Sequence, residues 1–220
     1  MSRVPFPDVT GRRLRAPSRT SFAGDGMASL GHASMNATNI TWKDLHEAAQ
    51  DFGVSPRAII SAAWGYVLYL YVTHECDNVA FDAVDADTCV AISFGPSLCR
   101  WEDPISMVQL SEKAWLSDRR VQIHGPVLFV SAPDQDTQSA LSLAESTLSR
   151  TNSSLSLVFI AHQAHTSTSS SSSHPVALTL LASPSVHIHG SAMTQLAQVE
   201  HVLHALVHRL DLTQCIPTEL

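Results

Sequence analysis

One run of the sequence restricts the fold more than any other: residues 54–72 carry a single charged side chain, Arg57. Ser55 and Pro56 are typical of a helix N-cap and a first helical residue. The helix that they predict, with its apolar body over residues 58–72, is about 22 Å long in that body, which is short of the roughly 30 Å hydrocarbon core of a bilayer. Its apolar side chains fall on every face, so we expect a helix packed on several sides inside a core.

The segments on either side of this run have clear local signals. Thr41 and Asp44 form a capping-box pattern before an amphipathic helix that Gly53 ends. After the run, residues 78–84 and 88–94 read as two strands, and Asp85-Ala86-Asp87 predicts the turn between them.

The rest of the chain alternates between strand and helix patterns. We expect a helix over residues 103–120 with Ile105, Val108, Trp115 and Leu116 on its buried side. Further strands are predicted over residues 127–131, 155–161, 176–182 and 186–189, and further helices over residues 139–150 and 192–210. This order predicts an α/β protein, a two-layer sandwich in which helices cover a mixed sheet.

The composition divides the chain into three parts. Residues 1–40 read as a basic, Pro/Gly/Ser-rich arm that is extended or partly disordered, residues 41–212 as one domain, and residues 213–220 as a tail. Within the domain, residues 166–174 are a Ser-rich spacer for which we expect a mobile surface loop. The arm holds five arginines, yet we interpret it as a leader because it lacks helical periodicity.

The charge balance and the start of the chain limit the partners and the compartment. A formal charge of -7 with only 13 Lys and Arg residues argues against nucleic acid as the main partner. The start shows no secretory apolar region, so we expect a cytoplasmic protein with reduced thiols and no membrane segment.

Local motifs for chemistry are weak. The sequence holds no GxSxG elbow, HExxH pair, phosphate-binding loop or Gly-rich dinucleotide turn, and we predict no catalytic residue in it. His201, His204 and His208 lie on one face of the last helix, opposite its leucine stripe, so we interpret them as a solvated face and expect no metal site. His187 and His189 alternate along one strand and are weak candidates for a substrate cleft.

The region around the uncharged run also resembles a known family. Gly53-Val54-Ser55-Pro56, Ala62-Ala63-Trp64 and Val79-Ala80-Phe81 are similar to the start of the C-terminal lobe of condensation domains from nonribosomal peptide synthetases, especially fungal ones. The segments "GPVLFVSAP" and "HPVALTLLAS" resemble later strands of that lobe, and "FPDVTGRR" resembles linker sequence in fungal siderophore synthetases. The likeness is strong over residues 41–84 and loose over residues 85–220.

The resemblance implies one lobe of a chloramphenicol-acetyltransferase-like fold that forms amide bonds between carrier-bound aminoacyl units. The implied partners are an N-terminal condensation lobe and the carrier and adenylation domains of a synthetase. Phosphopantetheine would belong to the carrier domains, and no cofactor is expected in this chain. The family's catalytic His-His-x-x-x-Asp-Gly motif belongs to the N-terminal lobe and is absent from this sequence.

Two departures from the family lie just after the strong match. Asp82 replaces a family glycine and is a further cleft candidate, and Asp85-Ala86-Asp87-Thr88 stands where the family has Ser-Gly-Arg. We therefore expect a partial condensation domain that is inactive alone, as a fragment or a degenerate lobe. The alternative is a non-catalytic binding or scaffold domain with the same half-fold.

Overall fold

The computed structural model describes residues 31–71, 78–85, 88–95, 98, 103–117, 126–131, 137–151, 157–163, 175–182, 192–210 and 212. The helices are α1 (Trp42–Phe52), α2 (Pro56–Tyr71), α3 (Pro104–Trp115), α4 (Thr137–Thr151) and α5 (Ala192–Val207). The strands are β1 (Gly31–Thr41), β2 (Val79–Val84), β3 (Cys89–Phe94), β4 (Val127–Val130), β5 (Leu157–Gln163) and β6 (Pro175–Ala182).

The six strands form one mixed sheet in the order β1-β6-β5-β4-β2-β3. The central strand β4 runs parallel to both of its neighbours, β2 and β5, whereas the other neighbouring pairs are antiparallel. The mixed α/β sheet with helical cover is therefore as predicted.

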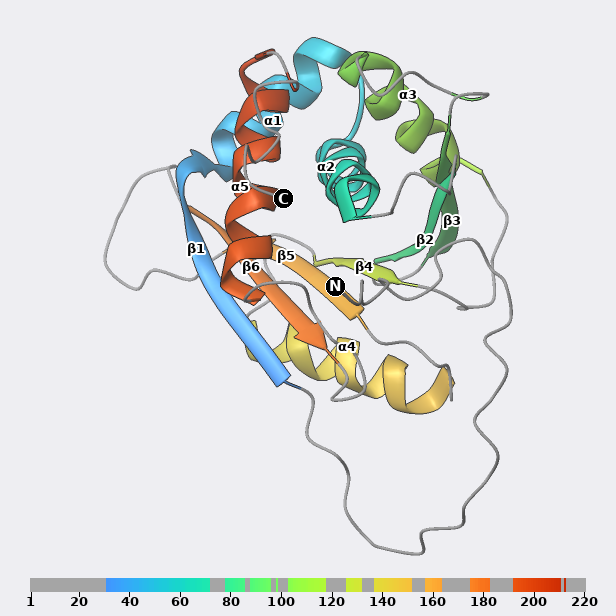
Figure 1. The fold of residues 1–220 in the computed structure, drawn as a ribbon, viewed down its shortest axis with the longest axis vertical. Helices are drawn as coiled ribbons and strands as arrows, with labels where there is room; N and C mark the ends of the chain where they lie inside the picture. Colours follow the sequence, from blue (N-terminus) through green and yellow to red (C-terminus); the bar gives the residue numbers. More distant parts are fainter. Residues whose placement is uncertain are drawn as a thin grey trace, which may run out of the picture.

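The helices cover the two faces of the sheet unequally. In Figure 1, α1, α2, α3 and α5 lie on one side of the sheet, and α4 lies alone on the other. Most of the buried apolar side chains belong to the core between the four helices and the sheet. A smaller core lies under α4, built from Val84, Val127, Phe129, Ala140, Ala144 and Leu181. The single helix α4 adds a partial third layer to the predicted two.

The start of α1 follows the local signals. The Thr41 hydroxyl accepts from the Asp44 N–H at 3.2 Å, and the Asp44 carboxylate accepts from the Thr41 N–H at 2.8 Å. Gly53 ends the helix in the left-handed region, at φ 65°. The capping box and the glycine stop are both confirmed.

Helix α2 occupies the centre of the larger core. Pro56 is its first residue, as predicted, and every side chain from Ala58 to Leu68 is buried. The hydroxyl and the N–H of Ser55, the predicted N-cap, both donate to the Glu112 carboxylate of α3, at 2.5 and 3.0 Å. No helix in the described residues is long and apolar enough to cross a membrane.

Two predictions are wrong. Residues 31–40, expected to belong to the arm, lie in β1 and pair with β6 at the sheet edge, because a long-range partner supplies the order that local composition lacks. Ile105 and Leu116 are exposed, Leu116 by 72%, because the buried stripe of α3 runs through Met107, Val108, Ser111 and Trp115. Ser111 makes that stripe hard to recognise in the sequence, since its hydroxyl is satisfied by the Met107 carbonyl at 3.0 Å.

Candidate functional site

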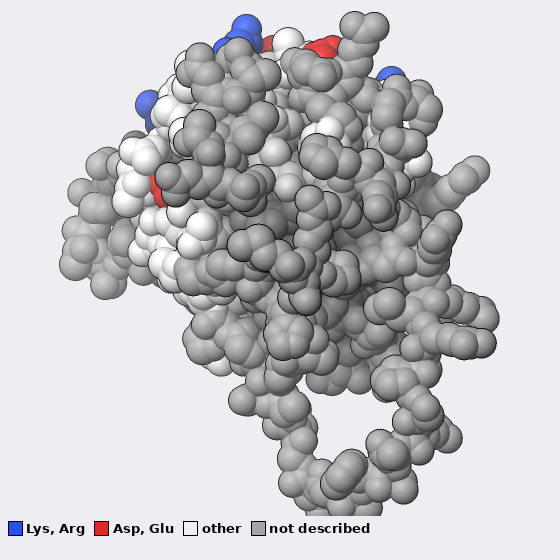
Figure 2. Space-filling view, viewed as in Figure 1, with Lys and Arg blue, Asp and Glu red and all other residues white. Residues whose placement is uncertain are grey.

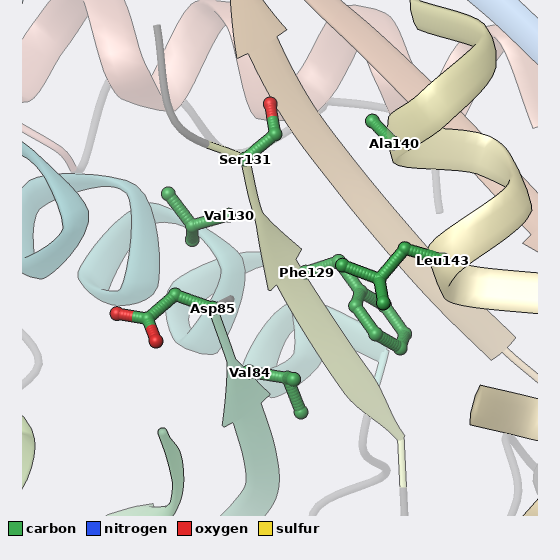
Figure 3. Close-up of a pocket in the computed structure, with 7 residues that line it drawn as sticks. All are labelled: Val84, Asp85, Phe129, Val130, Ser131, Ala140 and Leu143. Atoms are coloured by element: carbon green, nitrogen blue, oxygen red, sulfur yellow. The ribbon is translucent and has the colours of Figure 1, made fainter. Parts of the chain in front are cut away.

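A hollow opens where the parallel strands β2 and β4 end and α4 begins (Figure 3). The hollow is shallow: its empty space is about 210 Å³ when the part open to solvent is counted, but the room for water-sized molecules is about 10 Å³, which is about one water molecule. The residues around it are Val84, Asp85, Phe129, Val130, Ser131, Ala140 and Leu143. In open α/β sheets ligands bind outside the carboxyl ends of parallel strands, so this hollow is the best-placed candidate site among the described residues.

The two sides of the hollow differ in polarity. Figure 3 shows Val84, Phe129 and Leu143 together on the α4 side, while the Asp85 carboxylate points away from them. Ser131, which follows β4 directly, is buried and adds a hydroxyl to a lining whose other polar side chain is that of Asp85. At this size the hollow marks the place where the strand ends converge on α4, and it is not a formed pocket for a ligand.

An ion pair fixes the polar wall of the hollow. Arg57, in the first turn of α2, donates from Nη1 to Asp85 Oδ2 at 2.6 Å. The other Asp85 oxygen, Oδ1, accepts from the Thr88 N–H at 2.8 Å and from the Thr88 hydroxyl at 2.6 Å. The predicted turn role of Asp85 is confirmed, whereas Asp87 lies outside the described residues.

A tryptophan and a serine hold Arg57 in this position. The Arg57 guanidinium carbon lies 4.6 Å from the centroid of the Trp115 ring of α3. The Trp115 indole N–H donates to Ser61 Oγ at 3.0 Å, and the Ser61 hydroxyl donates to the Arg57 carbonyl at 2.7 Å. We name Arg57, Ser61, Asp85, Thr88 and Trp115 the arginine clasp. It ties α2, α3 and the β2–β3 turn together beside the hollow.

The predicted cleft residue Asp82 lies near the hollow but not in its lining. Asp82 lies in β2, between Ala91 of β3 and Val127 of β4. Residues two apart in a strand point to the same face, so the Asp82 side chain lies on the α4 side of the sheet, as Val84 does. The residue is only 6% exposed. Burial, together with the charge of Asp82, raises the pKa of the Cys89 thiol to about 11. His187 and His189, the other two cleft candidates, lie outside the described residues.

The sequence contained a partial signal for the clasp. Arg57 is the single charge in an otherwise uncharged run, and a charge at the edge of a core helix needs a partner. The partner was not predictable, because Asp85 lies 28 residues away and had a sufficient local explanation as a turn residue. Ser131 had no signal beyond its place after a strand.

The histidine face of α5 matches the sequence interpretation in part. His201 and His208 are exposed, but His204 is half-buried. Leu196, Val199, Leu203 and Leu206 of the predicted stripe are buried, whereas Leu210 is 48% exposed. Burial, with the charges of His208 and His201, lowers the pKa of His204. No group of three or more His, Cys, Asp or Glu side chains in the described part of the chain is arranged to hold a metal ion.

On the face drawn in Figure 2 the described charged side chains are dispersed. Figure 2 shows the described Lys and Arg in separate spots near the rim of the view, with Asp and Glu between them, rather than in one basic patch. On this face the described charges therefore offer no track for a phosphate backbone.

Comparison with solved structures shows the fold. No protein-family model matches the chain, and no curated protein matches it. The X-domain in a complex with OxyB from teicoplanin biosynthesis matches with a TM-score of 0.61 at 11% identity, over 88% of this chain and 49% of that one. The first condensation domain of the calcium-dependent antibiotic synthetase gives 0.54 at 11% identity, over 84% and 47%.

A third structure, the condensation domain of the monacolin K polyketide synthase MokA, gives a TM-score of 0.55 at 10% identity, over 96% of this chain and 55% of that one. The chain thus spans about half the length of the structures that it matches. Its α/β fold resembles one lobe of a condensation domain, as the sequence predicted.

Proposed function

We propose that this chain works as the C-terminal lobe of a condensation-type acyltransferase in nonribosomal peptide assembly. The observation that carries the proposal is the match of nearly the whole chain to about half of several condensation and X-domains. The proposed reaction joins carrier-bound aminoacyl units by an amide bond, in the synthesis of a secondary metabolite such as a siderophore peptide.

In this proposal the lobe supplies a wall and the partner lobe supplies the proton-transfer group. General-base or orienting chemistry at the amine requires a positioned histidine, and the His-His-x-x-x-Asp-Gly motif is absent from the sequence. The hollow between β2, β4 and α4 would face the acyl groups. The arginine clasp would keep the end of β2 in place while substrates pass.

The chemical character of the lining is closer to that of an acyl group than to that of a phosphate-binding site. It combines apolar side chains with one hydroxyl and one carboxylate, and it includes no Lys or Arg. The phosphate end of a phosphopantetheine arm would therefore be held elsewhere, by the carrier domain or the partner lobe. The chain's contribution would be to exclude water from the thioester end.

The two sequence departures lie close to the hollow. Where the family has a Ser-Gly-Arg turn after β2, this chain has Asp85-Ala86-Asp87-Thr88, and Arg57 of α2 binds Asp85 at 2.6 Å. A guanidinium therefore still lies near the turn, but it is that of Arg57 in α2, and it is already paired with the Asp85 carboxylate. A paired guanidinium is less available to a substrate, which favours a positioning role over a chemical one.

Turnover with carrier-bound substrates tests this proposal. Aminoacyl units loaded on a donor and an acceptor carrier protein are incubated with the chain, and dipeptidyl carrier is measured by mass spectrometry. We expect no product above the carrier-only control, because the catalytic histidine is not supplied. Turnover that disappears when a single histidine of this chain is replaced would overturn the proposal.

A second candidate is a non-catalytic docking domain. The observation that favours it is that the structure with a TM-score of 0.61 is an X-domain in complex with OxyB. On this reading the same half-fold binds a protein partner and needs no second lobe. A monomer with no tendency to associate, and with no binding of an apolar dye, would favour this candidate over the lobe.

A further inference from the structure

Two histidine rings stack against each other at the end of α5, outside the hollow and the arginine clasp. The centroids of His204 and His208 lie 4.4 Å apart, with 58° between the ring planes. The His208 N–H donates to the His204 carbonyl at 3.0 Å, so the backbone between them keeps the helical i to i+4 hydrogen bond. The pair is therefore set one helical turn apart on a regular backbone.

This spacing is a chelating one. Two histidines at i and i+4 on one helical face are the pair that binds zinc in the HExxH motif. Two nitrogens on one tetrahedral zinc ion lie about 3.3 Å apart, given bonds of about 2.0 to 2.1 Å. The centroids of the two rings are 4.4 Å apart, so both imidazoles already lie side by side on the same turn of the helix.

We propose that His204 and His208 form a two-imidazole surface site for a divalent transition-metal ion of the Zn²⁺, Ni²⁺ and Cu²⁺ class. Imidazole nitrogen is a ligand that these ions share, whereas Mg²⁺ and Ca²⁺ prefer oxygen. Water completes the coordination. No third His, Cys, Asp or Glu in the described residues completes a metal cluster, so the site is open and exchangeable.

The helix beneath the pair is anchored in the core. Val199, Leu203 and Leu206 are buried on its opposite side, which fixes the backbone that carries both rings. His208 is exposed and His204 half-buried, so an ion from solvent reaches the pair without an opening step. A site built on a packed helix loses less conformational entropy on binding than one on a loop.

The charged groups around the pair are consistent with a bound cation. Asp44 of α1 is close enough to interact electrostatically with His208. Arg209, the adjacent cation, is directed toward α1, where it meets Asp51 at 3.4 Å and lies 5.0 Å from the Phe52 ring centroid. The positive charge adjacent to His208 in the sequence is thus engaged by residues of α1.

The spacing does not imply hydrolysis. In the HExxH motif the residue after the first histidine is a glutamate that acts as general base, and here that position is Ala205. The inference is therefore a binding site and not a second activity.

Isothermal titration of the full chain with Zn²⁺, Ni²⁺ and Cu²⁺, and with Mg²⁺ as a negative probe, tests the site. We expect affinity to rise from Zn²⁺ and Ni²⁺ to Cu²⁺, following the usual order for nitrogen ligands, and no Mg²⁺ binding. His204→Ala and His208→Ala should each weaken binding by roughly tenfold or more, because each leaves one imidazole.

Matched controls separate this pair from the chain's other histidines. His201→Ala removes the exposed neighbour one turn earlier, and His46→Ala removes a ring whose Nδ1 lies 2.8 Å from the Trp42 carbonyl oxygen. Both controls should keep the wild-type affinity for the ion. If His204→Ala and His208→Ala bind the ions as tightly as the wild type, the proposal is wrong, whatever the total binding of the chain.

A structural readout guards against indirect effects. Hydrogen exchange of the amides of residues 204–208 should slow when Zn²⁺ is added to the wild type, because chelation closes the last turn of α5. His208→Ala should lose this protection while its circular dichroism stays that of the wild type. Equal Zn²⁺-dependent protection in His208→Ala would contradict the site.

Discussion

Arg57 is the residue that connects the most elements at the candidate site. The Arg57 carbonyl accepts a hydrogen bond from the Ser61 hydroxyl, and its guanidinium lies against the Trp115 ring. The same guanidinium donates to the Asp85 carboxylate, which also accepts from the Thr88 hydroxyl. The side chains of Arg57 and Asp85 are 30% and 22% exposed, so water screens this pair less than a typical surface pair. Loss of one partner therefore leaves a charge that is partly withdrawn from water.

Replacement of Asp85 tests the clasp. We expect Asp85→Ala to lower the free energy of unfolding by about 1 to 3 kcal/mol, because it leaves Arg57 and Thr88 without their acceptor. Asp85→Asn keeps an acceptor for Thr88 and should cost less. Urea denaturation measures both. Lys43→Ala, which breaks an exposed pair with Glu47, is the control and should stay within about 0.5 kcal/mol of wild type.

Cys89 offers a prediction with a defined pH dependence. Its pKa is raised to about 11 by burial and by the charge of Asp82, so alkylation by iodoacetamide should be slow near neutrality and still rising at pH 10. Asp82→Asn should speed alkylation at fixed pH, since it removes a charge that opposes the thiolate. Peptide mass spectrometry reports the rate at Cys89, and Asp103→Asn, in the exposed N-cap of α3, is the control. A plateau near pH 9 would show an ordinary thiol.

The same shift has a consequence for stability. An unfolded thiol has an ordinary pKa of 9.0, whereas the pKa of the folded Cys89 thiol is about 11. The unfolded state therefore binds fewer protons in this window, and the contribution of Cys89 to stability falls as the pH rises from 9 to 11.

At the scale of elements, α2 meets β3 without room for a side chain. A Cβ added at Gly65 would lie 2.1 Å from Phe94 Cε2, and Phe94 is fully buried. Glycine is a poor helix former, so its presence in the middle of α2 is explained by this close approach and not by local preference.

Gly65→Ala should be destabilising for that reason. Helix propensity alone predicts a gain of about 1 kcal/mol, whereas the overlap with Phe94 predicts a net loss of roughly 1 to 3 kcal/mol. A double-mutant cycle with Phe94→Leu, followed by chemical denaturation, should show that the smaller partner recovers part of the loss. If the two changes are additive, the ring is not the cause.

The edge strand β1 is hydrogen-bonded by Glu200 of α5, which is distant in the sequence. The Glu200 carboxylate of α5 is only 7% exposed and accepts from the Thr38 and Asn39 N–H groups at 2.5 and 3.1 Å. These residues lie where the pairing of β1 with β6 shifts register, between Asn36 and Thr41. The carboxylate thus satisfies N–H groups in the irregular stretch of β1.

At the scale of the whole molecule, the exposed apolar side chains indicate where a partner could bind. Among the described residues the large exposed apolar side chains are Leu98, Ile105, Leu116, Met193 and Leu210. Ile105 and Leu116 are eleven residues apart on α3, which places them on one side of that helix at 100° per residue. The outer side of α3 is therefore where a partner lobe would gain most from contact.

The lobe proposal predicts self-association through apolar surface. Light scattering coupled to size exclusion should show dimers or larger species whose fraction rises with concentration. Leu116→Ser should reduce that fraction, and Met193→Ser, on α5, should change it less. A monomer at all concentrations, without binding of an apolar dye, would contradict the lobe and favour the docking domain.

The sequence by itself determined the features whose signals act within one element: the core helix α2, the capping box of Thr41 and Asp44, and the Asp85 turn. Periodicity and capping involve neighbours one to four residues apart, so they can be read along the chain. Helical spacing also predicted the outward-facing histidines of α5, whereas the half-fold was implied by the resemblance to condensation domains.

Only the tertiary structure decided the contacts between distant residues. Strand β1 forms because Glu200, 162 residues from Thr38, and strand β6 supply its partners. The arginine clasp and the hollow form where α2, α3, β2 and β4 come together in space. No local sequence pattern predicts that arrangement. Gly65 and Ser111 are explained by what packs against them, and the fold, not their neighbours in the sequence, fixes that packing.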